Sequence, residues 1–317
     1  MGSKRVNRIF LTMILLHIVV IVLLGILTPV FQLGMIANFI LSQLMILGPA
    51  VIGTKLAGEN VLRFAGFRKI RISTGFMICL FTYLSMPLTV LVNAISMFFV
   101  ENTVSAMSGD ILQLPFVVML LIIGVLAPLS EEFVFRGIFF QGYKRSGTTL
   151  QAILLSALLF SLVHMNFNQA AYAFVIGIIV ALLVEATGSL WSSVLFHVLF
   201  NSGQVCLMYV SDWLTKQVGV AEASVEEAAL NMEVSQEVLL TATSKILVVA
   251  AVATLLALGV LIWIAKNEKR EECLFAVWRE KKNENKKRDK MITVPLIVAI
   301  IIALLYMGLL AVLPYLL

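Results

Sequence analysis

Residues 115–141 read PFVVMLLIIGVLAPLSEEFVFRGIFFQ. A helix crosses the hydrocarbon core of a bilayer with about 20 apolar residues, so this stretch predicts a membrane span. It nevertheless contains three ionisable side chains within six residues, Glu131, Glu132 and Arg136. An unpaired charge inside a membrane is energetically costly. Each of the three is therefore expected to have either a partner or a function.

The rest of the chain is similarly apolar. Of its 317 residues, 61% are hydrophobic and only 13% are charged, and the mean hydropathy is +1.02. This composition is typical of a polytopic membrane protein and excludes a soluble globular domain. The sequence predicts an all-α transmembrane helical bundle of about nine spans, near residues 9–30, 34–54, 74–99, 115–141, 149–164, 168–186, 189–210, 245–265 and 291–316.

The basic residues indicate how this bundle is oriented. If the N-terminus is cytoplasmic, the loops on that side contain every Lys and Arg of the chain except Arg136, Lys216 and Lys245. An excess of Lys and Arg marks cytoplasmic loops, so we predict an N-terminus inside and a C-terminus outside. The first apolar run lacks a small-residue cleavage site, and we interpret it as a retained span. No eukaryotic targeting signal is visible, which favours the plasma membrane of a bacterium.

The predicted spans and loops divide the chain into four regions. These are N-terminal helices at 1–113, a catalytic core at 114–210, an acidic extracytoplasmic segment at 211–243, and a C-terminal pair of spans with a basic cytoplasmic loop at 244–317. SVEE at 224–227 has the pattern of a capping box, so we expect a surface helix there. The basic stretch 266–290 is expected to fix the topology beside anionic lipid, or to dock an acidic partner.

The three ionisable side chains of residues 115–141 differ in their expected surroundings. Glu132 and Arg136 are four residues apart, so they share one helix face and are expected to form an ion pair. Glu131 is rotated by about 100° from Glu132 and can face a cavity instead. Pro128 lacks a backbone N–H and predicts a kink just before the two glutamates.

Polar side chains in two later spans complete a candidate site. His164 ends the fifth predicted span, and His197 lies in the seventh with Asn201 one helical turn later. At 1.5 Å per residue, these three and Glu131 lie about 12 to 21 Å below the cytoplasmic surface. In a hydrocarbon core of roughly 30 Å they can share one layer near the midplane.

A carboxylate, two imidazoles and an amide suit the hydrolysis of an amide bond. A glutamate can act as general base on a water molecule, and imidazoles can orient that water or bind a metal. An asparagine or a protonated histidine can donate to the tetrahedral oxyanion. The sequence has no HExxH zinc motif, no GxSG serine motif and no GxGD aspartate motif.

Three short motifs resemble one family of membrane proteases. EEFVFR at 131–136 resembles the EExxxR motif of the CAAX-protease and bacteriocin-processing family, also called the Abi family. FSLVH at 160–164 is similar to its FxxxH motif, and HVLFN at 197–201 to its HxxxN motif. Their order and the spacing between them also fit, and the resemblance covers roughly residues 114–206.

The resemblance implies an intramembrane endopeptidase with a catalytic set of Glu131, Glu132, Arg136, His164, His197 and Asn201. In that family the first glutamate activates water and the first motif histidine is its companion. The last histidine and the asparagine lie near the oxyanion or a metal. A divalent metal, zinc by the chemistry of imidazole and carboxylate ligands, would take Glu131, His164 and His197. A glutamate-dependent reaction without metal stays open.

Two hypotheses compete with proteolysis. The chain can be a non-catalytic bacteriocin-immunity or scaffold protein that binds a partner through its loops. It can also be a transporter in which the buried carboxylates and histidines relay protons, although no inverted repeat is visible. Under the leading hypothesis the partners are the lipid bilayer and a membrane protein or peptide substrate other than a prenylated CAAX protein, and no nucleic acid.

Overall fold

The computed structural model describes residues 1–28, 30, 32–217, 236–280 and 290–312. Eight helical stretches in these residues are long and apolar enough to cross a membrane. They are α1 (Ser3–Leu27), α2 (Met35–Lys55), α4 (Ile72–Ser96), the stretch Phe116–Lys144, α11 (Phe167–Thr187), α12 (Leu190–Gln217), α14 (Gln236–Asn267) and α16 (Val294–Val312). The protein is therefore an integral membrane protein with the predicted all-α fold.

The ninth predicted span and two predicted boundaries differ from expectation. The segment expected at 149–164 forms α10 (Thr149–Leu162), whose 14 residues extend only about 21 Å. Helices α12 and α14 extend into the region 211–243, which we expected to lie outside the membrane. The surface helix expected at 224–227 lies outside the described residues, as does part of the basic stretch 266–290. The division into four regions stays a prediction.

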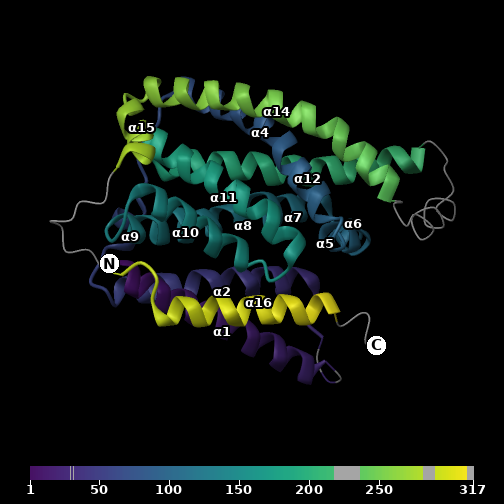
Figure 1. The fold of residues 1–317 in the computed structure, drawn as a ribbon. Helices are drawn as coiled ribbons and strands as arrows, with labels where there is room; N and C mark the ends of the chain where they lie inside the picture. Colours follow the sequence, from purple (N-terminus) through teal and green to yellow (C-terminus); the bar gives the residue numbers. More distant parts are fainter. Residues whose placement is uncertain (29, 31, 218–235, 281–289, 313–317) are drawn as a thin grey trace.

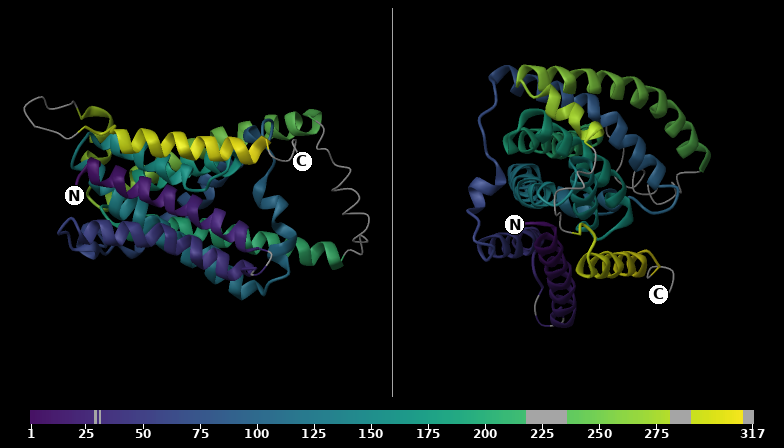
Figure 2. Two further views of the ribbon diagram at one scale, coloured as in Figure 1. Left: turned by 90° about the horizontal axis from the view of Figure 1, so that it is seen from below. Right: turned by 60° about the vertical axis from the view of Figure 1, so that its left-hand side comes forward.

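The helices form a bundle around the stretch Phe116–Lys144 (Figure 1). That stretch packs against α2, α10, α11 and α12, whereas α14 pairs with α4 on one side of the bundle and α16 with α1 on the other. Figure 2 shows α16 lying alongside α1. The close approach of α11 to α10 depends on Gly177, where a Cβ atom would lie 2.7 Å from that of Ala157. The stretch Phe116–Lys144, which carries the two glutamates, is thus the centre of the fold.

The predicted cytoplasmic segments lie at one end of the bundle. The N-terminus, α9 (Gln141–Lys144) and α15 (Glu271–Arg279) lie together there in Figure 1. The Ser3 backbone N–H donates to the Ser146 hydroxyl at 2.8 Å. We call this the basic end of the bundle. Its composition agrees with the predicted cytoplasmic N-terminus.

Candidate active site

The helix that carries the two glutamates is interrupted by wider turns. Between α7 (Phe116–Met119) and α9 it runs as π-helix η1 (Leu120–Leu126), α8 (Ala127–Glu132) and π-helix η2 (Phe133–Phe140). In a π-helix the backbone bonds join residues five apart, and such turns occur frequently at functional sites. Residues Glu131 and Glu132 end the short α-helical piece between the two π segments.

Side chains from α12 complete the backbone bonding at this break. Pro128 has no N–H, so it cannot donate to the carbonyl four residues earlier or to the one five residues earlier. Those carbonyls belong to Gly124 and Ile123, and Ser202 Oγ and Asn201 Nδ2 donate to them, each at 3.2 Å. Neighbouring side chains are the usual way in which a membrane helix tolerates a proline. We call these two contacts the α12 clamp.

Glu132, Arg136 and His197 form a buried cluster, which we call the core cluster. Arg136 Nη1 lies 3.0 Å from Glu132 Oε1, so the predicted ion pair is confirmed. His197 Nδ1 lies 2.9 Å from the same oxygen. The side chains of Glu132 and Arg136 are 0% exposed. Because an ion-paired carboxylate accepts hydrogen bonds, the proton of a neutral His197 ring is on Nδ1 and Nε2 keeps its lone pair.

The core cluster is only partly satisfied within the described residues. The Arg136 guanidinium lies 4.2 Å from the centroid of the Phe160 ring, which is a cation–π contact. Its Nε and Nη2 atoms, and Oε2 of Glu132, are buried without a hydrogen-bond partner. The Ser193 hydroxyl lies beside Glu132 but donates to the Leu190 carbonyl at 3.0 Å. Such a network costs stability, which suggests that it is kept for function.

Glu131 occupies a different environment from its neighbour. Its Oε2 lies 3.8 Å from Nε2 of His197, so this histidine has a glutamate at each ring nitrogen. The Glu131 side chain is 11% exposed, whereas that of Glu132 is fully buried. The sequence predicted this difference from the rotation between adjacent helical positions. Of the two carboxylates, that of Glu131 is therefore the more accessible.

His164 enters the same layer because α10 is short. The helix ends at Leu162, so the turn that follows lies at membrane depth, and Met165 in this turn adopts a left-handed φ of 54°. Irregular backbone at that depth occurs where it is buried in protein or lines a cavity. His164 Nδ1 lies 2.8 Å from the Phe160 carbonyl, which leaves Nε2 with the lone pair.

The ring of Phe160 joins the two histidines. Its centroid lies 5.0 Å from that of His164 and 5.7 Å from that of His197, with edge-to-face geometry in both cases. Asn201 is placed differently, because its amide is turned toward the Ile123 carbonyl. The structure therefore places Glu131 and His164 beside the core cluster and Asn201 at the break in the helix.

Metal binding by Glu131, His164 and His197 stays a prediction. Within the described part of the chain, no three His, Cys, Asp or Glu side chains lie close enough together to hold a metal ion. The bond from Nδ1 of His197 to Glu132 is of the kind that orients metal-binding histidines, but the same bond also orients a histidine that acts without metal.

A protein-family model matches the region that contains the site. Residues 113–203 match the family model described as type II CAAX prenyl endopeptidase Rce1-like. The matched region contains every predicted site residue and nearly coincides with the region of the motif resemblance. The comparison with curated proteins found no match, and the comparison with solved structures found none either.

Proposed function

We propose, on the premise that residues 113–203 belong to this CAAX-protease family, that the protein is an intramembrane endopeptidase in which Glu131 activates a water molecule. The observation that carries the proposal is the contrast between two adjacent glutamates. Glu132 is fully buried and ion-paired with Arg136, whereas the Glu131 side chain is 11% exposed and lies 3.8 Å from His197.

The proposed reaction uses these side chains in distinct roles. Glu131 takes one proton from water as the oxygen attacks the scissile carbonyl carbon. His164 orients that water through the lone pair on Nε2. The second amide hydrogen of Asn201 donates to the tetrahedral oxyanion. When the C–N bond breaks, Glu131 returns its proton to the leaving nitrogen, so the products are a carboxylic acid and an amine.

The core cluster has a supporting role in this proposal. The ionised Glu132 holds Nδ1 of His197, and Nε2 of the same ring faces Glu131. Arg136 compensates the charge of Glu132 in the membrane interior. The three groups therefore hold the His197 ring in place beside Glu131, the proposed base. Binding of a metal ion stays a prediction, and no step of the proposed reaction uses a metal. Metal analysis of the purified protein would test it.

Substitution of Glu131 by Gln tests the proposal directly. We expect Glu131→Gln to abolish cleavage and to leave the amount of protein in the membrane unchanged, because the amide keeps the shape but cannot accept the proton. The measurement compares membrane proteomes of cells that express the wild type or the variant. Fragments with new termini near or inside the bilayer should be present only with the wild type. Glu101→Gln, in a loop between spans, is a matched control.

Two results would contradict the proposal. Unchanged fragments with Glu131→Gln would show that another group activates the water. Identical proteomes, together with a variant that still confers the phenotype of the gene, would favour the non-catalytic immunity or scaffold hypothesis. The substrate, a membrane protein or peptide, would be identified by the fragments themselves.

A further inference from the structure

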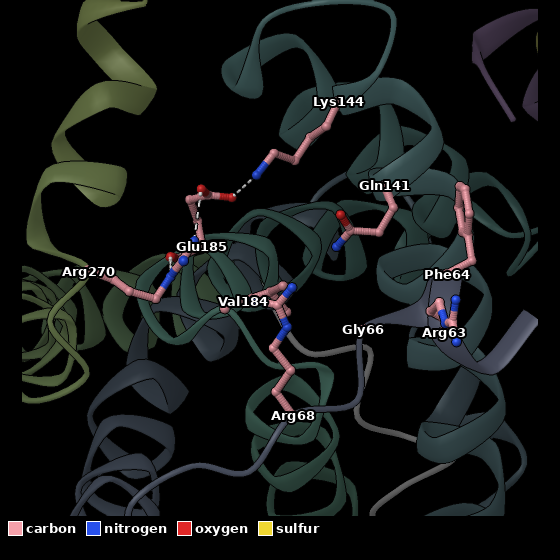
Figure 3. Close-up of a pocket in the computed structure, with 10 residues that line it drawn as sticks. Arg63, Phe64, Gly66, Arg68, Gln141, Lys144, Val184, Glu185 and Arg270 are labelled. Carbon is pink, nitrogen blue, oxygen red and sulfur yellow. Dashed lines mark hydrogen bonds and ion pairs between the residues drawn. The ribbon is translucent and has the colours of Figure 1, made fainter.

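The basic end of the bundle contains a cavity that the proposed reaction does not use. It has a volume of about 310 Å³ and is shown in Figure 3. Four separate segments line it: α3 (Val61–Ala65) with the loop that follows, α9, the end of α11, and the residue before α15. The side chains that matter for its chemistry are Arg63, Arg68, Gln141, Lys144, Glu185 and Arg270. We call it the basic pocket.

The cations of the basic pocket exceed its single carboxylate. Lys144 Nζ lies 2.5 Å and Arg270 Nη2 lies 3.5 Å from oxygens of Glu185, and both side chains point at it in Figure 3. Arg63 and Arg68 have no acidic partner among the residues that the structure describes. Four cations thus share one anion, and an anionic ligand is the group that would balance the excess.

The walls of the basic pocket are held in place without a ligand. The Ser189 hydroxyl donates to the Arg68 carbonyl and accepts from the Arg68 backbone N–H. The Leu190 backbone N–H donates to the Gly66 carbonyl at 3.1 Å. Gly188 has a φ of +70°, and a Cβ atom there would lie 2.9 Å from Nε of Arg270. Preorganised walls lower the conformational cost of binding.

The position of the basic pocket fits a ligand at the membrane surface. Its lining includes α9 and the residue before α15, which lie at the end of the bundle that contains the predicted cytoplasmic loops. Next to it, the rings of Phe67 and Trp191 are 5.0 Å apart, and Trp191 is 47% exposed. Tryptophan is enriched at the level of lipid headgroups. Basic pockets between helices on the cytoplasmic side bind phosphate-bearing headgroups.

We propose that the basic pocket binds a phosphate-bearing anion, supplied either by the headgroup of an anionic phospholipid or by free phosphate. Arginine forms paired hydrogen bonds with phosphate oxygens, and Arg63 and Arg68 are the two arginines without a carboxylate partner among the described residues. Lys144 and Arg270 keep the opposite wall positive while Glu185 orients them. This site is separate from Glu131 and does not depend on the proposed protease activity.

Binding of defined probes to the delipidated full-length protein tests the site. We would titrate dioctanoyl-phosphatidylglycerol, dioctanoyl-phosphatidylcholine and inorganic phosphate and measure bound species by native mass spectrometry. The variant is Arg63→Gln/Arg68→Gln. The control is Arg5→Gln/Arg8→Gln, which removes two exposed arginines from the basic end outside the pocket. We expect the pocket variant to bind the anionic probe about ten-fold or more weakly, and the control to bind like the wild type.

Each result has a defined meaning. Binding of phosphatidylglycerol but not of phosphate identifies a lipid headgroup, and binding of both identifies the phosphate group itself as the ligand. Equal losses in the two double variants would reduce the effect to general surface charge and overturn the proposal. If the pocket variant does not fold, the binding of the three probes to the wild type is the test. A wild type that binds phosphatidylcholine as well as phosphatidylglycerol, and does not bind phosphate, has no anion site.

Discussion

The core cluster and the cluster of Lys144, Glu185 and Arg270 at the basic end are built alike. In each, one carboxylate contacts two basic side chains. They differ in their access to water. The side chains of Glu132 and Arg136 are 0% exposed, whereas those of Lys144 and Arg270 are 28% exposed. The same kind of contact therefore has different consequences in the two places.

Access to water determines how much stability is lost when one charged partner is removed. At the basic end, water and salt ions can replace a lost partner, so the remaining charge stays solvated. In the core cluster nothing can replace it, and a single deletion leaves an uncompensated buried charge. Three polar atoms of Glu132 and Arg136 already lack hydrogen-bond partners among the described residues. No further hydrogen bond in the core cluster is therefore available to compensate for a deletion. This comparison predicts large effects in the core and small, salt-sensitive effects at the basic end.

The largest effect is expected for Arg136→Ala. The substitution leaves the buried charge of Glu132 without a counter-charge, which should destabilise the protein by about 3–5 kcal/mol. Activity should be lost as well, because Glu132 would no longer hold His197 as an ionised acceptor. Thermal unfolding in detergent and cleavage of an identified substrate are the two measurements.

The control for this substitution is Arg145→Ala. Arg145 pairs with Glu59 and its side chain is 52% exposed, so removing it should cost less than about 1 kcal/mol. An additional variant, Glu132→Gln/Arg136→Gln, should be more stable than Arg136→Ala because it removes both charges. If Arg136→Ala were as stable and active as Arg145→Ala, the comparison between the clusters would fail.

Local geometry explains which features could be predicted from sequence. The ion pair of Glu132 and Arg136 joins residues four apart on one helix, so the helix repeat alone places them together. The different exposure of Glu131 follows from the same repeat. The spans follow from composition, since a hydrocarbon core requires long apolar helices. These features need no knowledge of how the helices pack.

Packing between helices explains what was not predicted. His197 is 65 residues from Glu132 in the chain, and only the packing of α12 against α8 and η2 brings them together. The contact of the Asn201 amide with the Ile123 carbonyl was not predicted, and its role at an oxyanion or a metal stays a prediction. Pro128 was a visible signal of an interrupted helix, but the π-helical turns and the contribution of Ser202 depend on tertiary contacts.

An intermediate effect is expected for the α12 clamp. Asn201→Ala leaves the Ile123 carbonyl without a donor, which should cost about 1–2 kcal/mol and misplace Glu131. Pro128→Ala supplies a backbone N–H that can bond to that carbonyl or to the carbonyl of Gly124. The loss caused by Asn201→Ala should therefore be smaller in the Pro128→Ala background, as measured by thermal unfolding of the four proteins.

Equal losses in both backgrounds would contradict the clamp. They would show that Asn201 contributes to stability through something other than the carbonyls near Pro128. Ser202→Ala is the matched comparison, because its hydroxyl donates to the Gly124 carbonyl at the same distance of 3.2 Å. It should show the same dependence on Pro128 with a smaller loss of cleavage, since Asn201 alone is assigned to the oxyanion.

The smallest effect is expected for Glu185→Gln, and its dependence on salt separates the two clusters. The substitution removes the carboxylate between two cations that are each 28% exposed. Water can solvate the charges that remain, so we expect a loss of about 1 kcal/mol at low ionic strength. At 1 M salt the Debye length falls to about 3 Å, and the loss should nearly vanish. The loss caused by Arg136→Ala should be the same at both salt concentrations, because ions do not reach a side chain that is 0% exposed. A salt-independent loss with Glu185→Gln would show that the two clusters respond alike to the removal of a partner. Their difference in burial would then not explain their stability.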